Sequence, residues 1–127
     1  MEAEWEFAAR GCKNSNKSEY SGSNILDKVA WCRETSGGNP HEVGTKAANE
    51  LGIYDMSGNV WEWCQDWYGD YDASSKTNPK GASSGSNRVL RGGSWFNNPQ
   101  FCRVSLRRYF VPGNRLNFVG FRLVLTP

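Results

Sequence analysis

The sequence predicts a loop-rich α+β domain with few helices and short antiparallel strands. A helical repeat occurs only at the start of the chain, and no helical period continues beyond residue 13. Short apolar stretches follow, separated by segments rich in Gly, Ser and Asn, as is typical of strands joined by turns. Six tryptophans compensate for a hydrophobic content of 38%, because each indole buries a large area. A length of 127 residues suffices for one core.

Residues 2–11 predict the one clear helix. Apolar residues recur at i, i+3 and i+4 from Trp5, acidic residues fill the first turn, and Gly11 can end the helix. This helix begins almost at Met1, with no capping residue and no preceding strand. We therefore expect a domain that is entered part-way through.

The later elements are short. Residues 29–32 and the Trp-rich run 60–67 are apolar stretches, and residues 72–87 predict a Ser-, Gly- and Lys-rich loop. Residues 88–91 and 121–125 predict short strands. No apolar run approaches the roughly 20 residues of a membrane span, and no secretion signal is visible.

The net charge of +2 conceals two halves of opposite sign. Residues 1–72 contain all 13 acidic and six basic residues, whereas residues 73–127 contain nine basic residues and no acidic one. Such asymmetry raises the question of a nucleic-acid partner. The alternative is that the two halves neutralise each other within one fold.

Five motifs occur in an order that points to a known family. They are residues 2–10 (EAEWEFAAR), 51–69 (LGIYDMSGNVWEWCQDWYG), 91–95 (RGGSW), 102–103 (CR) and 120–122 (GFR). Together they resemble the formylglycine-generating-enzyme (sulfatase-modifying factor) family over essentially the whole chain. The resemblance implies a single domain, residues 1–127, with that family's variety of the C-type lectin fold. The family's first strand and first helix are missing, so we expect a minimal version, a fragment, or a domain completed by a partner.

The resemblance also implies one calcium site. Asp55, Gly58, Val60 and Glu62 match the positions at which family enzymes bind calcium through two carboxyl-type side chains and two backbone carbonyls. Oxygen ligands of this kind suit Ca²⁺. Glu62 could equally be the acceptor of an internal network with arginines. The sequence leaves both interpretations open.

The family's catalytic pair is incomplete. The oxidation of a substrate cysteine in this family resembles copper chemistry, carried out by two cysteines that lie five residues apart after the Gly-Gly-Ser-aromatic motif. In this sequence the second of these positions is Cys102, and the first is Asn97. Cuprous copper prefers thiolates, and an Asn amide cannot replace one. We therefore expect no copper and no oxidase activity. The alternative is a formylglycine-generating-type enzyme, or a degenerate relative of one, that depends on a partner domain.

The four cysteines need another explanation. We predict that Cys64 and Cys102 lie close together, as a disulfide or as two buried thiols, with Cys12 and Cys32 as the other candidate pair. No Cys-x-x-Cys motif is present to indicate zinc. The single histidine, His41, lies in a polar turn.

Residues 96–118 are unusually apolar for a segment that we expect to be mostly loop. Their apolar residues follow neither a strand nor a helix period. Among family members, the variable proteins of diversity-generating retroelements have such a block, in which adenines of Asn codons (AAC) are replaced. Lys, Glu, Met and Trp cannot arise in that way, and none occurs in this block. An ordinary apolar loop that packs on the core is the alternative.

The sequence thus predicts a non-catalytic protein that presents a hypervariable surface to a protein or other macromolecular ligand. Exposed aromatic residues on a rigid scaffold give a large contact area at low entropic cost. The candidate contact residues are Phe96, Asn97, Asn98, Phe101, Val104, Leu106, Arg108, Tyr109, Phe110, Val111, Leu116, Asn117 and Phe118. We do not expect nucleic-acid binding, because six of the nine bases occupy family frame positions: Arg88, Arg91, Arg103, Arg107, Arg115 and Arg122. The oligomeric state and the compartment stay open, with display on a cell surface or a virion among the options.

Overall fold

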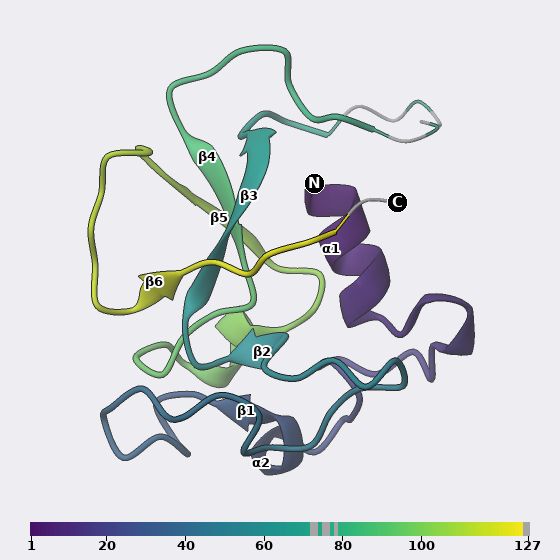
Figure 1. The fold of residues 1–127 in the computed structure, drawn as a ribbon, viewed down its shortest axis with the longest axis vertical. Coiled ribbons are helices and arrows are strands. Elements are labelled where there is room, and N and C mark those ends of the chain that lie inside the picture. The colour runs from purple at the N-terminus through teal and green to yellow at the C-terminus, as the bar shows by residue number, and fades with distance from the viewer. Residues whose placement is uncertain (72–73, 75–76, 78, 126–127) are drawn as a thin grey trace.

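A four-stranded sheet forms the centre of the fold in the computed structural model, which describes residues 1–71, 74, 77 and 79–125. The strands are β3 (Trp61–Trp67), β4 (Arg88–Arg91), β5 (Arg107–Phe110) and β6 (Val119–Gly120), in the spatial order β5-β4-β3-β6 (Figure 1). β4 pairs with β3 and β5 in antiparallel fashion, and β6 runs parallel to β3. The prediction of short antiparallel strands therefore holds for three of the four.

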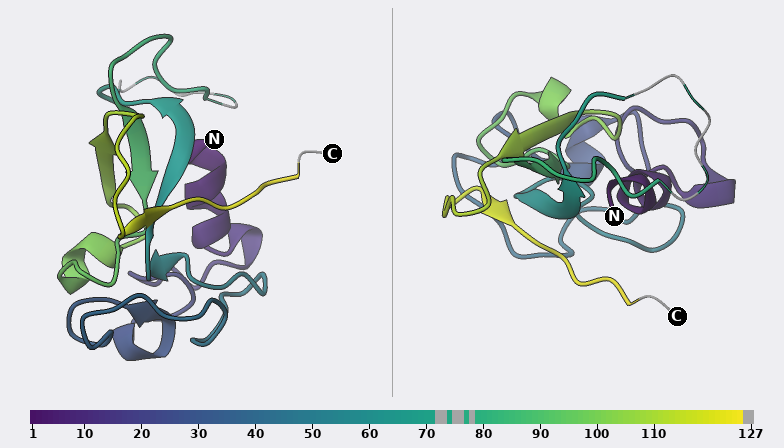
Figure 2. Two further views of the ribbon diagram at one scale, coloured as in Figure 1. Left: turned by 60° about the vertical axis from the view of Figure 1, so that its left-hand side comes forward. Right: turned by 90° about the horizontal axis from the view of Figure 1, so that it is seen from above.

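Helix α1 (Glu2–Ala9) lies against one face of this sheet (Figure 2). The predicted helix is confirmed, and its C-terminal end is followed by Gly11 in the left-handed region, at φ 81°. Its buried residues Trp5 and Ala9 join the first of two apolar clusters, which contains Trp5, Ala9, Met56, Cys64, Val89 and Val104. Burial of these apolar side chains stabilises the packing of α1 against the sheet.

A second layer lies below the sheet in Figure 1. It contains α2 (Leu26–Val29) and the parallel pair β1 (Ala30–Trp31) and β2 (Ser57–Gly58), and two 3-10 turns flank the layers, η1 (Cys12–Asn14) and η2 (Pro99–Cys102). The second apolar cluster lies here and contains Tyr20, Val29, Cys32 and Cys102. Gly58 allows β1 and β2 to approach closely, because a Cβ at this position would lie 2.3 Å from the Trp31 carbonyl oxygen.

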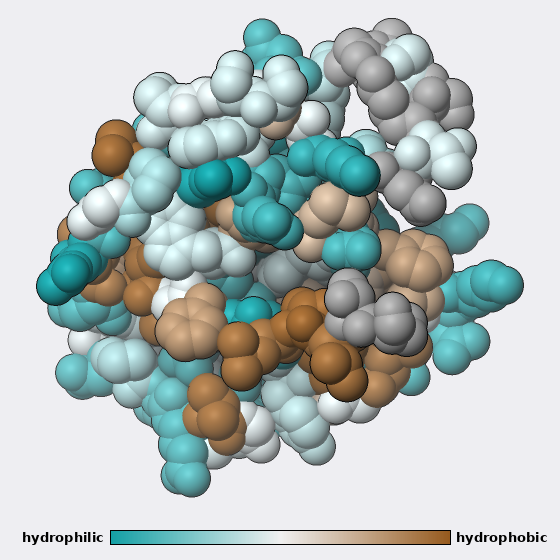
Figure 3. All heavy atoms as spheres, turned by 45° about the horizontal axis from the view of Figure 1, so that its top comes forward, coloured by the Kyte–Doolittle hydropathy of each residue, from teal (hydrophilic) through white to brown (hydrophobic). Residues whose placement is uncertain are grey.

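One predicted strand is confirmed and one is wrong. Residues 88–91 form β4, whereas residues 121–125 form no strand, and the short pairing to β3 lies just before them, at β6. Beyond Gly120 the chain leaves the sheet (Figure 2). Phe121, Leu123 and Leu125 are consequently exposed, with Leu125 at 95%. Figure 3 shows hydrophobic side chains gathered on one face of the molecule.

Ion pairs join the two oppositely charged halves. Four of the six frame arginines form ion pairs with acidic residues of the first half: Arg91 with Glu2 and Glu6, Arg103 with Glu19, Arg107 with Glu2, and Arg122 with Glu62. Arg88 instead lies over the Trp67 ring, 3.4 Å from its centroid. Among the described residues, no helix is long and apolar enough to cross a membrane.

Candidate functional site

A groove of about 480 Å³ lies where residues 96–118 fold over the end of β3. Eight of its eleven lining residues are candidate contact residues from the sequence: Phe96, Asn97, Phe101, Arg108, Tyr109, Phe110, Val111 and Phe118. The other three are Trp61, Asn87 and Asn114. The segment from β5 to β6, which supplies part of the lining, is the loop at the left of Figure 1. The structure thus brings eight of the thirteen candidate contact residues to one concave surface.

The aromatic rings of the groove contact one another at the surface. The Phe96 and Phe118 rings stack with centroids 5.9 Å apart, and Phe110 lies 6.4 Å from Phe118. Phe96 and Tyr109 are 50% and 46% exposed, and the other groove phenylalanines are half-buried. An apolar loop packed into the core would hide these rings, so the arrangement matches a presented surface instead.

Strand β5 supplies three consecutive residues of the groove lining, Arg108, Tyr109 and Phe110. Arg108 and Phe110 share the face toward the groove, where the Arg108 guanidinium lies 4.8 Å from the centroid of the Phe101 ring. Arg107 points to the opposite face and pairs with Glu2 at 2.7 Å. Tyr109 also lines the groove, and its ring packs on Tyr68 with centroids 4.2 Å apart.

Asn97 holds the floor of the groove in place. Its Oδ1 accepts hydrogen bonds from Trp61 Nε1 at 2.8 Å and from Ser94 Oγ at 2.6 Å, and its backbone carbonyl accepts from the Arg33 N–H. A buried indole N–H needs an acceptor. Asn97 is therefore a positioning residue for Trp61. Trp61, the first residue of β3, is 3% exposed and belongs to the core, and it also forms part of the groove lining.

The remaining candidates lie outside the groove lining. Val104 is 2% exposed and belongs to the first apolar cluster, so its prediction as a surface contact is wrong. The Leu106 carbonyl accepts a hydrogen bond from Arg91, and Asn98 precedes η2 as its N-cap. Leu116 and Asn117 are exposed on the loop before β6.

The predicted pairing of Cys64 with Cys102 is wrong. Cys64 lies in the first apolar cluster, and Cys102 lies in the second, beside Cys32. Burial raises the pKa of Cys64 to about 12. Cys12 is half-buried in η1, and all four thiols are free. The residues that adjoin Cys64 and Cys102 in the sequence do not indicate which of the two apolar clusters each thiol enters.

The two carboxylates among the proposed calcium ligands already accept hydrogen bonds. Asp55, Val60 and Glu62 line a shallow pocket with Arg122, whereas Gly58 is buried in β2. Arg122 donates to both carboxylate oxygens of Glu62, at 2.6 and 2.8 Å, and Trp5 Nε1 also donates to Glu62. Asp55 accepts the Gly44 N–H at 2.7 Å. As the side chains stand, this donor set does not fit a cation, because the guanidinium already neutralises Glu62.

We accordingly expect calcium to leave the stability of the domain unchanged. Adding about 1 mM CaCl₂ should shift the Tm by less than about 1 °C, since only a bound cation stabilises the folded state by mass action. Thermal denaturation with CaCl₂ or EDTA checks this, with Glu62→Gln as the control. A rise of several degrees that EDTA reverses, and that Glu62→Gln lacks, would restore the calcium interpretation.

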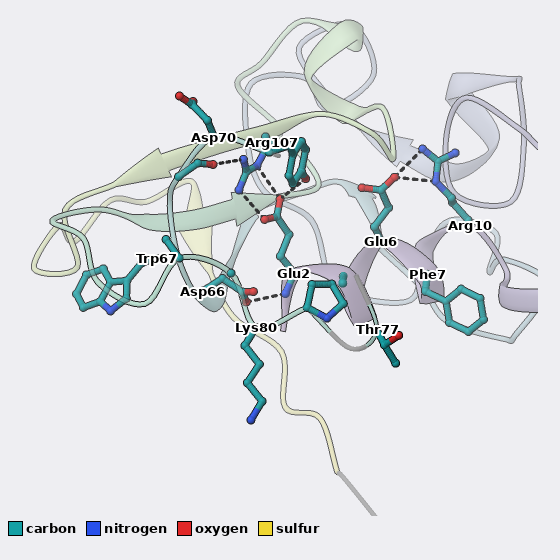
Figure 4. Close-up of a pocket in the computed structure, with 16 residues that line it drawn as sticks. Glu2, Glu6, Phe7, Arg10, Asp66, Trp67, Asp70, Thr77, Lys80 and Arg107 are labelled. Atoms are coloured by element: carbon teal, nitrogen blue, oxygen red, sulfur yellow. Dashed lines mark hydrogen bonds and ion pairs between the residues drawn. The ribbon is translucent and has the colours of Figure 1, made fainter. Parts of the chain in front are cut away.

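A larger cavity, of about 750 Å³, lies at the contact between α1 and the second half of the chain (Figure 4). Four of its charged residues form two pairs: Arg107 binds Glu2 through two hydrogen bonds of 2.7 and 2.8 Å, and Arg10 binds Glu6. The Asp66 carboxylate accepts the backbone N–H of Glu2. These polar groups stabilise the contact between the two charged halves.

Comparison with known proteins identifies the same family as the motifs. A model of the sulfatase-modifying factor enzyme 1-like domain matches residues 1–127. The formylglycine-generating enzyme of Streptomyces coelicolor is 34% identical over 139 aligned positions, which cover 95% of this chain and 44% of that protein.

Two solved structures share the fold. "Treponema denticola variable protein 1" is 42% identical, with a TM-score of 0.88 over 95% of this chain and 44% of that one. PvdO from Pseudomonas aeruginosa is 30% identical, with a TM-score of 0.76 over 95% of this chain and 49% of that one. The chain spans less than half the length of each of these proteins. It has the C-type lectin fold of these relatives, and it belongs to the sulfatase-modifying factor enzyme 1-like family.

Proposed function

We propose that this chain is a non-catalytic ligand-binding domain that presents the groove of residues 96–118 as a surface diversified by a retroelement. One observation carries the proposal: a single contiguous block of sequence supplies nine of the eleven residues that line the groove. The similarity to a Treponema denticola variable protein supports it. The sheet and α1 fix the backbone on which this block varies.

The chemistry of the groove favours a protein or other macromolecular ligand. Phe96 and Tyr109 are exposed aromatic residues with few rotatable bonds, and Arg108 adds a charged donor beside them. Residues of these types dominate binding energy at protein interfaces. The frame arginines that could attract nucleic acid are mostly occupied in ion pairs with acidic residues.

The absence of catalysis is part of the proposal. The first of the two family cysteine positions is Asn97, and its side-chain oxygen already accepts hydrogen bonds from Trp61 and Ser94. An amide in this role supplies no thiolate for copper. We therefore infer that this chain shares the scaffold of its formylglycine-generating relatives without their reaction.

Sequencing the gene's 3′ end in many cells of one culture tests the diversification. We expect substitutions concentrated in the codons of the exposed groove residues, at positions that are adenines in a near-identical template copy close to a reverse-transcriptase gene. Codons 51–69, which encode the strand β3 motif, are the internal control. Equal substitution frequencies in the two regions, or the lack of a template copy, would overturn the proposal.

A further inference from the structure

Two buried thiols meet where the second layer contacts the variable block. Cys32 follows β1 and Cys102 ends η2, and both side chains are 0% exposed within the same apolar cluster. The two side chains pack in this one cluster, close enough for each thiol to shift the pKa of the other. They are separated by about 70 positions in the chain, so only the fold brings them together.

The backbone around this pair is held on both sides. The Arg33 N–H donates to the Asn97 carbonyl at 2.9 Å, and Ser36 Oγ donates to the Trp95 carbonyl at 2.9 Å. The Cys102 carbonyl accepts from Ser57 Oγ at 2.8 Å, on the strand that pairs with β1. These contacts fix the segments that carry the two sulfurs, so the thiols meet through an ordered packing of the two chain segments.

We propose that Cys32 and Cys102 form a disulfide when the chain folds in the presence of a low-molecular-weight disulfide, and that this bond ties the variable block to the second layer. The Cys32 thiolate attacks one sulfur of the small disulfide and releases one small thiolate. Cys102 then loses its proton and attacks the Cys32 sulfur, which releases the second small thiolate. The two protein sulfurs lose two electrons, the small disulfide gains them, and the two thiolates take up the two protons.

The environment assigns different roles to the two sulfurs. The hydrogen bond from Cys102 lowers the pKa of Cys32 to about 6, so Cys32 is the better nucleophile at neutral pH. The same hydrogen bond, together with burial, raises the pKa of Cys102, which remains a thiol until it resolves the mixed disulfide. Both sulfurs are buried in the folded domain, so the exchange takes place late in folding, when the two thiols already lie together and the small disulfide can still reach Cys32.

The Cys32–Cys102 disulfide would hold one wall of the groove in place. Cys102 directly follows Phe101, which lines the groove beneath the Arg108 guanidinium. A cross-link at this point restricts the unfolded chain and fixes η2, while the groove side chains stay free to change. The pair thus offers a means of tolerating substitutions that weaken the block.

Refolding the full chain with a mixture of reduced and oxidised glutathione tests the proposal. After denaturation, alkylation should modify two of the four cysteines, Cys12 and Cys64, and peptide mapping should recover a linked pair containing Cys32 and Cys102. Reduction should lower the Tm by roughly 10 °C, given the usual stabilisation by a long-loop disulfide.

Matched variants separate the pair from the other thiols. Cys12→Ser should retain both the linked peptide and the Tm difference, whereas Cys32→Ser should lose both. Peptide mapping of the unsubstituted chain decides the matter if Cys32→Ser fails to fold. Four alkylated cysteines, or a linkage between any other two, would overturn the proposal.

Discussion

Replacing Arg91 by methionine is expected to lower the free energy of unfolding by about 3 kcal/mol. The Arg91 side chain is 0% exposed, and its guanidinium lies between Glu2 and Glu6. It also donates to the Leu106 carbonyl at 2.7 Å. Methionine fills a similar volume, but it leaves Glu6 without this cation and the Leu106 carbonyl without its donor. Removing one partner of a buried network leaves the others incompletely satisfied.

Urea denaturation of the purified chain measures this effect. Arg108→Met is the matched control, because it makes the same substitution at an exposed arginine and should change the stability by less than about 0.5 kcal/mol. The two variants should show equal m-values, since neither is expected to alter the compactness of the fold. Equal stability of Arg91→Met and the unsubstituted chain would mean that the contact between the charged halves contributes nothing to folding.

Asparagine at position 104 is expected to destabilise the domain by about 3 kcal/mol. Val104 packs in the first apolar cluster, close to Trp5 and Val89, and is 2% exposed. An amide at this position enters an apolar environment that offers it no designed partner, and the valine methyl contacts are lost. Under the proposed diversification, Asn is also the residue that an unaltered template codon would encode, so this variant tests whether position 104 could belong to a variable surface.

Val111→Asn makes the same change at a residue of the groove that is 54% exposed. Its stability should lie within about 0.5 kcal/mol of the unsubstituted chain. Thermal or urea denaturation of the two variants side by side gives the comparison. If both substitutions change the free energy of unfolding only slightly, Val104 is not required for folding. If both lower it strongly, the result argues against a variable surface.

The features that could be predicted from the sequence depend on residues close together in the chain or on complementary charges. The period of α1, the apolar pattern of β4 and the opposite charges of the two halves each correspond to an observed element or contact. The composition of residues 96–118 indicates a contact surface, because loops are normally polar and exposed apolar side chains are typical of interfaces. Eight of the candidate residues then proved to share one groove.

The features that could not be predicted depend on contacts between distant segments. An apolar run at 121–125 is typical of a strand, but it says nothing about whether a partner strand lies beside it. The pairing of Cys32 with Cys102 depends on how the second layer meets η2, which no spacing rule contains. Val104 resembles its apolar neighbours in sequence, and only the fold shows that it is buried.

The alternation along β5 has a consequence for the kind of mutation that the block can accept. Arg107 binds Glu2 on one face, and Arg108 contacts Phe101 on the other. A shift of one residue in the pairing of β5 with β4 would exchange the two faces, taking Arg107 away from Glu2 and Arg108 away from Phe101. The four paired positions of β5 therefore depend on a fixed register, whereas the loops on either side of the strand do not. If the block is diversified as we propose, substitutions keep this register, and an insertion or deletion inside the strand would destroy it.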